Sequence, residues 1–135
     1  MSPIRFLVVH CSASPNDRDS VDAEEIHRWH VERGWSGIGY HAVIRRDGTV
    51  ENGRPSYWPG AHVRGFNSGS LGVCLVGTDQ FTDAQLNSLE GLLQAWKAQF
   101  PDAQICGHRD LDPQKTCPNF DVGHWWQSRK KNRID

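Results

Sequence analysis

Two short apolar runs, residues 4–10 and 71–77, constrain the fold more than any other feature of the chain. The first run is rich in β-branched side chains, and neither run alternates cleanly between apolar and polar residues. An unbroken run of this kind is typical of a strand that is buried on both faces of a sheet. The rest of the chain must therefore supply elements that cover such a sheet.

Three segments predict the covering helices. Asp22 and Glu25 form a D-x-x-E capping pattern at the start of the first helix, and Gly34 is a typical C-terminal stop. Residues 82–100 begin with a T-x-x-Q cap and then repeat apolar side chains at spacings of three and four. A last helix begins near Asp121. The apolar residues expected on the inner sides of the second and third helices are Leu86, Leu89, Leu93, Trp96, Phe100, Val122, Trp125 and Trp126.

A β-hairpin is predicted over residues 40–53, because Asp47-Gly48 lies between two strand-like runs. Strand alternation places Tyr40 on the same side of this hairpin as Ala42 and Ile44. A hairpin pairs its strands antiparallel, so the sheet cannot be all parallel.

The order of these elements predicts one α/β domain of residues 1–135, with a central mixed β-sheet flanked by helices. A length of 135 residues fits one domain, and the 37% apolar fraction can fill its core. Residues 54–70 are rich in glycine and aromatic side chains without a regular period, which is typical of a long loop that lines a groove. A short strand, residues 103–106, leads into a second loop over residues 107–119.

Charge, cysteine content and the N-terminus exclude several classes of protein. The net charge of −1, from 15 basic and 16 acidic side chains, gives no indication of a nucleic-acid partner. The four cysteines form no CxxC pair, so reduced thiols are expected. The N-terminus has neither a signal peptide pattern nor an apolar run long enough to insert in a membrane. We expect synthesis in the cytoplasm.

Three residues far apart in the sequence could bind one metal ion. His10 closes the first apolar run, and His108 and Cys117 bracket a loop after another predicted strand. Strand ends can converge on one cleft. Two histidines and one cysteine suit a catalytic zinc, because three protein ligands leave one position for a water whose pKa falls to about 7. The residues therefore indicate a hydrolase.

Other interpretations of the histidines and basic residues stay open at this point. A single histidine at a strand end is more often a hydrogen-bonded core or surface residue than a ligand. His27 and His30 could chelate a metal from one helix, but packing and solvated roles are favoured. For His124 a partly exposed aromatic role is favoured, and the basic run Arg129, Lys130, Lys131 and Arg133 is typical of a solvated helix end.

Five segments resemble a known family. VVHCSAS, IHRWHVERGW, GYHAVIRRDGTVENGR, GAHVRGFNSGSLGVCLVG and KTCPNFDV are similar to segments of the zinc-dependent N-acetylmuramoyl-L-alanine amidases. The similarity is closest to the small amidase-type phage lysozymes, in the wider group that includes the peptidoglycan recognition proteins. It covers residues 4–127, with the motifs in the same order.

The resemblance implies one zinc ion (Zn²⁺) per chain, bound by His10, His108 and Cys117. It also implies that Tyr40 and Lys115 are catalytic residues beside the metal. All five positions hold the residue types of the active enzymes. Cys117 favours an enzyme over a recognition protein, because the non-catalytic members commonly lack this ligand.

His62 and Asn67 fall where the family lines its substrate groove, which implies peptidoglycan as the partner. The expected reaction is hydrolysis of the amide between N-acetylmuramic acid and L-alanine, in a phage or prophage endolysin. A peptidoglycan-binding module and a regulator with structural zinc are the alternatives. A role in binding RNA polymerase is not favoured, because the chain begins nine residues before His10. We expect a monomer that reaches the wall after a holin-type membrane lesion or lysis.

Overall fold

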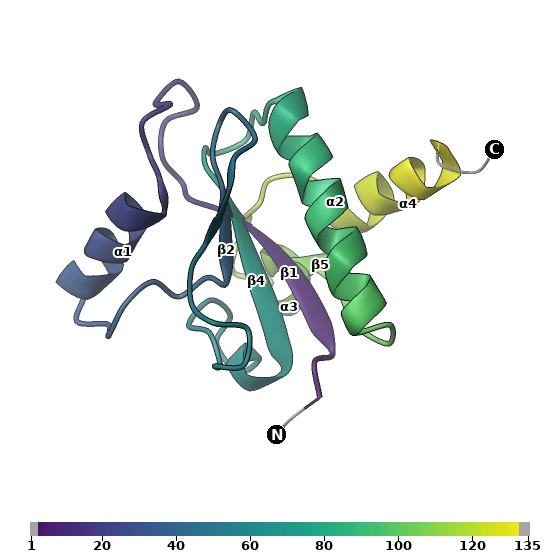
Figure 1. Ribbon diagram of the computed structural model, residues 1–135, viewed down its shortest axis with the longest axis horizontal. Helices are drawn as coiled ribbons and strands as arrows, with labels where there is room; N and C mark the ends of the chain where they lie inside the picture. The colour runs from purple at the N-terminus through teal and green to yellow at the C-terminus, as the bar shows by residue number, and fades with distance from the viewer. Residues whose placement is uncertain (1–2, 133–135) are drawn as a thin grey trace.

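Five strands form a mixed sheet in the order β3-β2-β4-β1-β5 (Figure 1). The computed structural model describes residues 3–132. Its strands are β1 (Phe6–Cys11), β2 (Ala42–Ile44), β3 (Val50–Asn52), β4 (Ser70–Leu75) and β5 (Gln104–Gly107). Its helices are α1 (Ala23–Glu32), α2 (Asp83–Gln99), α3 (His108–Leu111) and α4 (Val122–Asn132), with a 3₁₀ turn at Asn67–Gly69.

The two apolar runs form the centre of the sheet, as predicted. β1 pairs in parallel with both β4 and β5, and every residue of β4 is buried. β2 pairs in parallel with β4 and antiparallel with β3. Gly48 in the intervening turn has φ +91°, a left-handed conformation that glycine adopts without strain. The prediction of a single α/β domain with a mixed sheet is confirmed.

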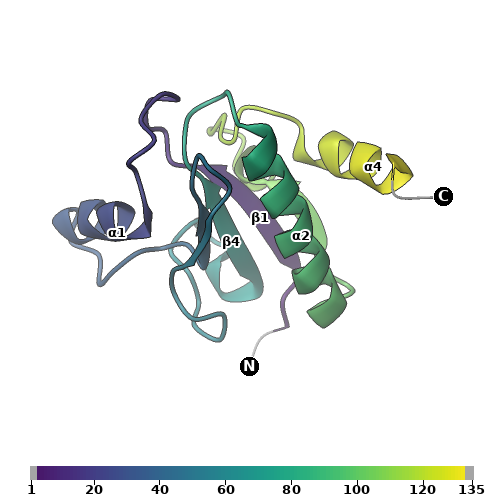
Figure 2. The same cartoon turned by 45° about the horizontal axis from the view of Figure 1, so that its top comes forward.

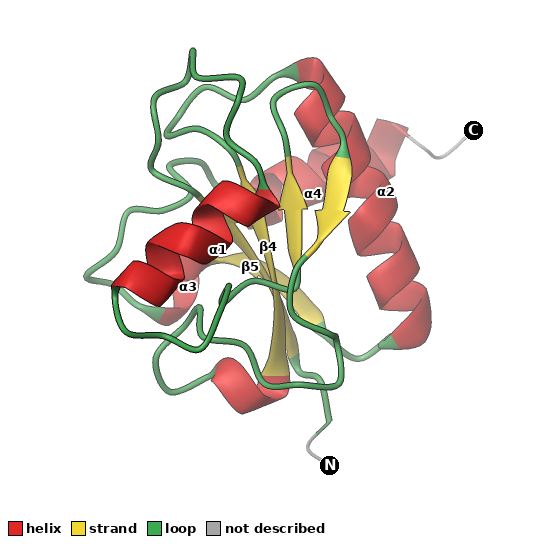
Figure 3. Cartoon of the chain, turned by 60° about the vertical axis from the view of Figure 1, so that its left-hand side comes forward, coloured by secondary structure: helices red, strands yellow, loops and turns green. Residues whose placement is uncertain are grey.

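The two faces of the sheet carry different side chains. Leu7 and Val9 of β1 belong to the largest apolar cluster, which packs between the sheet and the helices α2 and α4. Val8 points the other way, into a smaller cluster. Figure 2 shows α2 and α4 together on one side of the sheet and α1 well separated from them on the other side. In Figure 3, α1 lies in front of the strands, with loops around it.

Helix α2 begins as the sequence predicts. The Thr82 hydroxyl accepts a hydrogen bond from the Gln85 backbone, and the Gln85 side chain accepts one from the Thr82 backbone. The Gln85 side chain is fully buried, yet its amide donates to the carbonyls of Ile44 and Val76. Leu89 and Leu93 are also fully buried. This helix is therefore fixed to the sheet by both apolar packing and buried hydrogen bonds.

Helix α1 also starts and stops where expected. Asp22 accepts a hydrogen bond from the Glu25 backbone at the N-terminus, and Gly34, with φ +91°, follows the C-terminal residues. Ile26 and His30 are its buried residues.

Three details differ from the sequence predictions. Tyr40 packs with Val43 in a cluster opposite Ala42 and Ile44, because β2 begins only at Ala42 and the chain bends at His41. The short strand is displaced by one residue, to Gln104–Gly107. The predicted loop over residues 107–119 contains the one-turn helix α3, which is too short to show a helical period in the sequence.

The remaining predictions concern the thiols, the membrane and the basic run. Cys11, Cys74, Cys106 and Cys117 are all free, as expected. Within residues 3–132, no helix is both long enough and apolar enough to cross a membrane. Arg133 of the predicted basic run lies outside the described residues.

Candidate metal centre and active site

The three predicted metal ligands lie together. His10 is the second-last residue of strand β1, His108 directly follows the neighbouring parallel strand β5, and Cys117 lies in the loop after α3. One nitrogen or sulfur atom from each residue lies within 4.8 Å of the other two. They form the only such group of three or more metal-ligating residues in the part of the chain that the structure describes. The carboxyl ends of two adjacent strands thus build the cluster.

The geometry of the two histidines fits a zinc ion. Their Nδ1 atoms are 3.1 Å apart. Two nitrogen ligands at a tetrahedral zinc, each with a Zn–N distance of about 2.05 Å, are separated by roughly 3.3 Å. His10 is almost completely buried, whereas His108 and Cys117 are half-buried. The donor set of two imidazole nitrogens and one sulfur is typical of zinc and leaves room for a fourth ligand.

Burial keeps these histidines neutral, as metal ligands must be. Desolvation lowers the pKa of His10 well below its usual value, and the nearby His62 and His108 lower it further. Burial also lowers the pKa of His108. At neutral pH both rings therefore carry a free nitrogen lone pair rather than a second proton.

Cys117 needs a cation to become a thiolate. The adjacent Cys11 thiol, together with burial, raises the pKa of the Cys117 thiol. The Cys11 backbone N–H donates a hydrogen bond to the Cys117 sulfur over 3.0 Å, which supports negative charge on that atom. A bound divalent ion would compensate the burial, because coordination deprotonates a thiol.

The two predicted catalytic residues flank this cluster. The Tyr40 ring lies 5.0 Å from the His10 ring, measured between centroids. Burial raises the pKa of the Tyr40 hydroxyl well above its usual value, so this group stays protonated and can donate. Lys115 is exposed, and its charge contributes to lowering the pKa of His108. An aromatic ring and a positive charge therefore lie near the metal ligands.

The predicted groove residues have internal hydrogen bonds. His62 is 8% exposed, and its ring nitrogens lie 2.8 Å from His10 Nε2 and 3.1 Å from Ser70 Oγ. The Asn67 side-chain oxygen accepts from the backbone N–H groups of His62 and Val63, each over 2.8 Å. Neither ring nitrogen of His62 is free for a substrate in this arrangement. The substrate-binding role of both residues stays a prediction.

Comparisons with known proteins agree with this site. The model of the N-acetylmuramoyl-L-alanine amidase family matches residues 1–120. An endolysin of Klebsiella phage KP32 is 46% identical over 132 residues, covering 92% of this chain and 86% of the relative. The chain belongs to the N-acetylmuramoyl-L-alanine amidase family. The predicted family and the predicted peptidoglycan amidase activity of the endolysin type are thereby confirmed.

Solved structures of the family share the amidase fold. The N-acetylmuramoyl-L-alanine amidase LysC from Clostridium intestinale URNW superposes with a TM-score of 0.84 at 29% identity, covering 97% of this chain and 87% of that one. Drosophila peptidoglycan recognition protein LB superposes with a TM-score of 0.78 at 26% identity, covering 87% of this amidase and 76% of that protein. The mixed sheet and its helices are thus the fold of this wider group.

The other two candidate histidine ligands of the amidase accept hydrogen bonds from backbone N–H groups. His27 Nδ1 accepts from the Ile38 N–H over 3.0 Å, and His30 Nδ1 accepts from the Gly39 N–H over 2.9 Å. Both bonds tie the loop that leads to Tyr40 onto α1. His124 is exposed, as expected. Arg129 of the basic run pairs with Glu90 of α2 over 3.0 Å.

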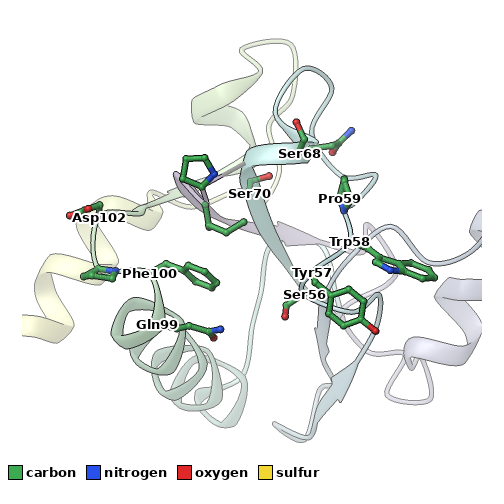
Figure 4. A pocket seen from close by; sticks show the side chains of 13 residues that line it. Ser56, Tyr57, Trp58, Pro59, Ser68, Ser70, Gln99, Phe100 and Asp102 are labelled. Atoms are coloured by element: carbon green, nitrogen blue, oxygen red, sulfur yellow. The ribbon is translucent and has the colours of Figure 1, made fainter. Parts of the chain in front are cut away.

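A groove of about 700 Å³ opens at the other end of the amidase sheet. Ile4, just before β1, and Ser70, at the start of β4, contribute to its lining. In Figure 4, Phe100 lies on one side of the groove, and Tyr57 and Trp58 lie on the other. The prediction that aromatics of the loop over residues 54–70 line a groove is confirmed. Because β1, β4 and β5 run parallel, this groove at their amino ends is at the opposite edge of the sheet from the metal ligands.

Two groups that contact a metal ligand, directly or through His62, escaped the sequence analysis of the amidase. The Cys11 N–H that donates to Cys117 is a backbone group, so no residue type indicates it. Ser70 is 2% exposed and contacts His62. A hydroxyl residue directly before a buried apolar run was the available signal, because buried hydroxyls almost always have a partner.

Proposed function

We propose that residues 1–135 form one catalytic domain whose activity depends on one zinc ion held by His10, His108 and Cys117. The observation that carries the proposal is the convergence of these three ligand atoms within 4.8 Å, at the carboxyl end of the sheet. With two neutral imidazoles and one thiolate bound to Zn²⁺, the site would have a net charge of +1. A bound zinc ion supplies Lewis acidity, which polarises an amide carbonyl and makes water more acidic.

Tyr40 would act on the leaving group. An amide nitrogen leaves poorly until it is protonated, so a hydroxyl beside the reacting carbonyl can donate or relay the proton that it needs. The raised pKa of Tyr40, caused first by burial, keeps that proton available at neutral pH. Its ring contact with His10 holds the hydroxyl-bearing side chain beside the metal ligands.

Lys115 would stabilise the negative charge that develops on the carbonyl oxygen. It lies two residues before Cys117, and its backbone N–H donates to the Asp112 carbonyl over 3.0 Å. The loop that carries the lysine is thereby fixed, while the side chain reaches from an exposed position. A cation placed at a developing oxyanion can contribute several kcal/mol to catalysis.

The substrate would be the peptidoglycan bond between the lactyl group of N-acetylmuramic acid and L-alanine, and Asn67 would line the groove that holds it. As in phage endolysins, the protein would accumulate in the host cytoplasm as a monomer. It would reach the wall once the membrane is breached by a holin-type lesion or by lysis.

The proposal is tested on purified peptidoglycan, with mass spectrometry of the soluble products. Release of unsubstituted stem peptides that start with a free L-alanine amine supports it. The matched variants are Cys117→Ala, which removes a ligand, and Cys106→Ala, which removes a buried thiol that is not among the ligands. Intact wall in the presence of zinc-loaded protein would instead favour a binding module or a regulator.

A further inference from the structure

A chain of buried hydrogen bonds runs from the candidate metal site into the protein. His10 Nε2 lies 2.8 Å from His62 Nδ1, and His62 Nε2 lies 3.1 Å from Ser70 Oγ. The Ser70 hydroxyl in turn donates to the Phe66 carbonyl over 2.7 Å. His10, His62 and Ser70 are 1%, 8% and 2% exposed. Water therefore has little access to these three side chains.

The carbonyl at the end of this series of hydrogen bonds fixes the direction of each bond. The Phe66 carbonyl can only accept, so the Ser70 hydroxyl uses its single proton there. The Ser70 oxygen must then accept from His62 Nε2, which leaves Nδ1 of the neutral His62 ring without a proton. His62 Nδ1 therefore accepts from His10 Nε2–H. The Nδ1 atom of His10, which faces His108, is left with a free lone pair.

Two glycines leave the space that the His62 ring occupies. A Cβ atom at Gly72 would lie 2.6 Å from His62 Nδ1, and one at Gly60 would lie 2.5 Å from its Cδ2. Both distances are far below van der Waals contact, so any larger residue would displace the ring. The backbone of His62 is fixed separately, because Asn67 accepts from its N–H group. The ring is oriented by its two hydrogen bonds, to His10 and Ser70.

We propose that His62 and Ser70 are positioning residues that hold His10 in the Nε2–H tautomer and so prepare its Nδ1 atom to bind zinc. This inference rests on the zinc site of the proposed function and assigns two further residues to it. Hydrogen-bond partners of metal-binding histidines fix the tautomer and orientation of the ring, and their loss typically lowers metal affinity 10–100-fold.

The first test measures zinc affinity by competition with a chelator of known affinity, well below the unfolding temperature. Ser70→Ala removes the acceptor for His62, and we expect its affinity for zinc to fall about 10-fold. His62→Phe keeps an aromatic ring but removes both hydrogen bonds of His62, and we expect its affinity for zinc to fall nearer 100-fold. Ser88→Ala is the matched control, because the Ser88 hydroxyl donates to the Gly48 carbonyl away from the site, and it should bind zinc as the wild type does.

The second test observes the tautomers directly, through the ¹⁵N chemical shifts of the histidine rings in the metal-free protein. Protonated Nε2 and bare Nδ1 on both His10 and His62 are expected, with a mixture of tautomers at His10 in Ser70→Ala. Wild-type zinc affinity in both variants, or a proton on His10 Nδ1 in the metal-free wild type, would overturn the inference. These outcomes are separate from those for the proposed function, since a wild type that binds zinc but leaves peptidoglycan intact refutes only the latter.

Discussion

Residues of the same strands have different roles on the two faces of the central sheet. On the face toward α2, Leu7 and Val9 join a large apolar cluster. On the opposite face, His10 follows Val8 and meets His62 and His108. Strand alternation alone separates the two sets. The face toward α2 stabilises the fold by burying apolar area, whereas the opposite face has smaller apolar clusters and also orients a few polar side chains.

The largest effect is expected from the loss of a metal ligand. Cys117→Ala should lose zinc, and amidase turnover should fall by on the order of 10³-fold or more, because Lewis-acid catalysis contributes several kcal/mol. Metal analysis and product release by mass spectrometry measure this. Cys106→Ala should retain both properties, and substantial turnover in Cys117→Ala would contradict the proposed site.

The apolar face should behave in the opposite way. Leu93 is fully buried in α2, so Leu93→Ala should lower the free energy of unfolding by about 2–5 kcal/mol and leave zinc affinity unchanged. Urea unfolding and chelator competition provide the two measurements. Leu92→Ala, at a half-buried position on the same helix, should cost less. A large loss of zinc affinity in Leu93→Ala would mean that the two faces are not independent.

The residues beside the metal should affect turnover without affecting the metal. Tyr40→Phe and Lys115→Ala should each retain zinc while kcat falls by about 10²-fold, since each removes a group that acts only on the developing charge or the departing amine. Steady-state kinetics on purified wall fragments, with metal analysis of the same samples, measure both properties. Lys130→Ala, on the exposed side of α4, is the control. Full turnover in either variant would remove that residue from the mechanism.

The smallest effect concerns acid stability on the histidine-bearing side. Burial, with Arg33 and Arg54 nearby, lowers the pKa of His30 from 6.5 to about 4. Between these values the unfolded chain binds the extra proton, so the free energy of unfolding should fall as pH decreases from 6.5 to 4. His30→Gln, which keeps an acceptor for the Gly39 N–H, should make this decline shallower. His124→Gln, at an exposed position, is the control; an equally steep decline in His30→Gln would contradict the assignment.

Local patterns predicted most of the fold because they report local physics. The capping residues Asp22 and Thr82 mark the starts of α1 and α2 through hydrogen bonds to residues three positions on. The Asp47-Gly48 turn identified the hairpin in the same way. The face occupied by Tyr40 was wrong, because alternation holds only within a strand and the bend at His41 lies before β2.

The sequence predicted the metal ligands but not the residues that hydrogen-bond to them. His10, His108 and Cys117 stand at strand ends and loops, where residue type and position together indicate a ligand. The partners of His62 are 52 residues before it and 8 residues after it in the chain. Contacts of this kind depend on the register of β1 against β4, which no local pattern specifies. His27 and His30 were ambiguous as well, because their hydrogen-bond partners lie across a loop.

The most direct test of the account is the return of zinc to metal-free protein while amide cleavage is followed. The account predicts that turnover rises in proportion to added zinc and stops rising at about one ion per chain, as expected for a single three-ligand site. Turnover in thoroughly metal-free protein would contradict the central claim, and so would protein that binds one zinc ion at His10, His108 and Cys117 without cleaving the amide.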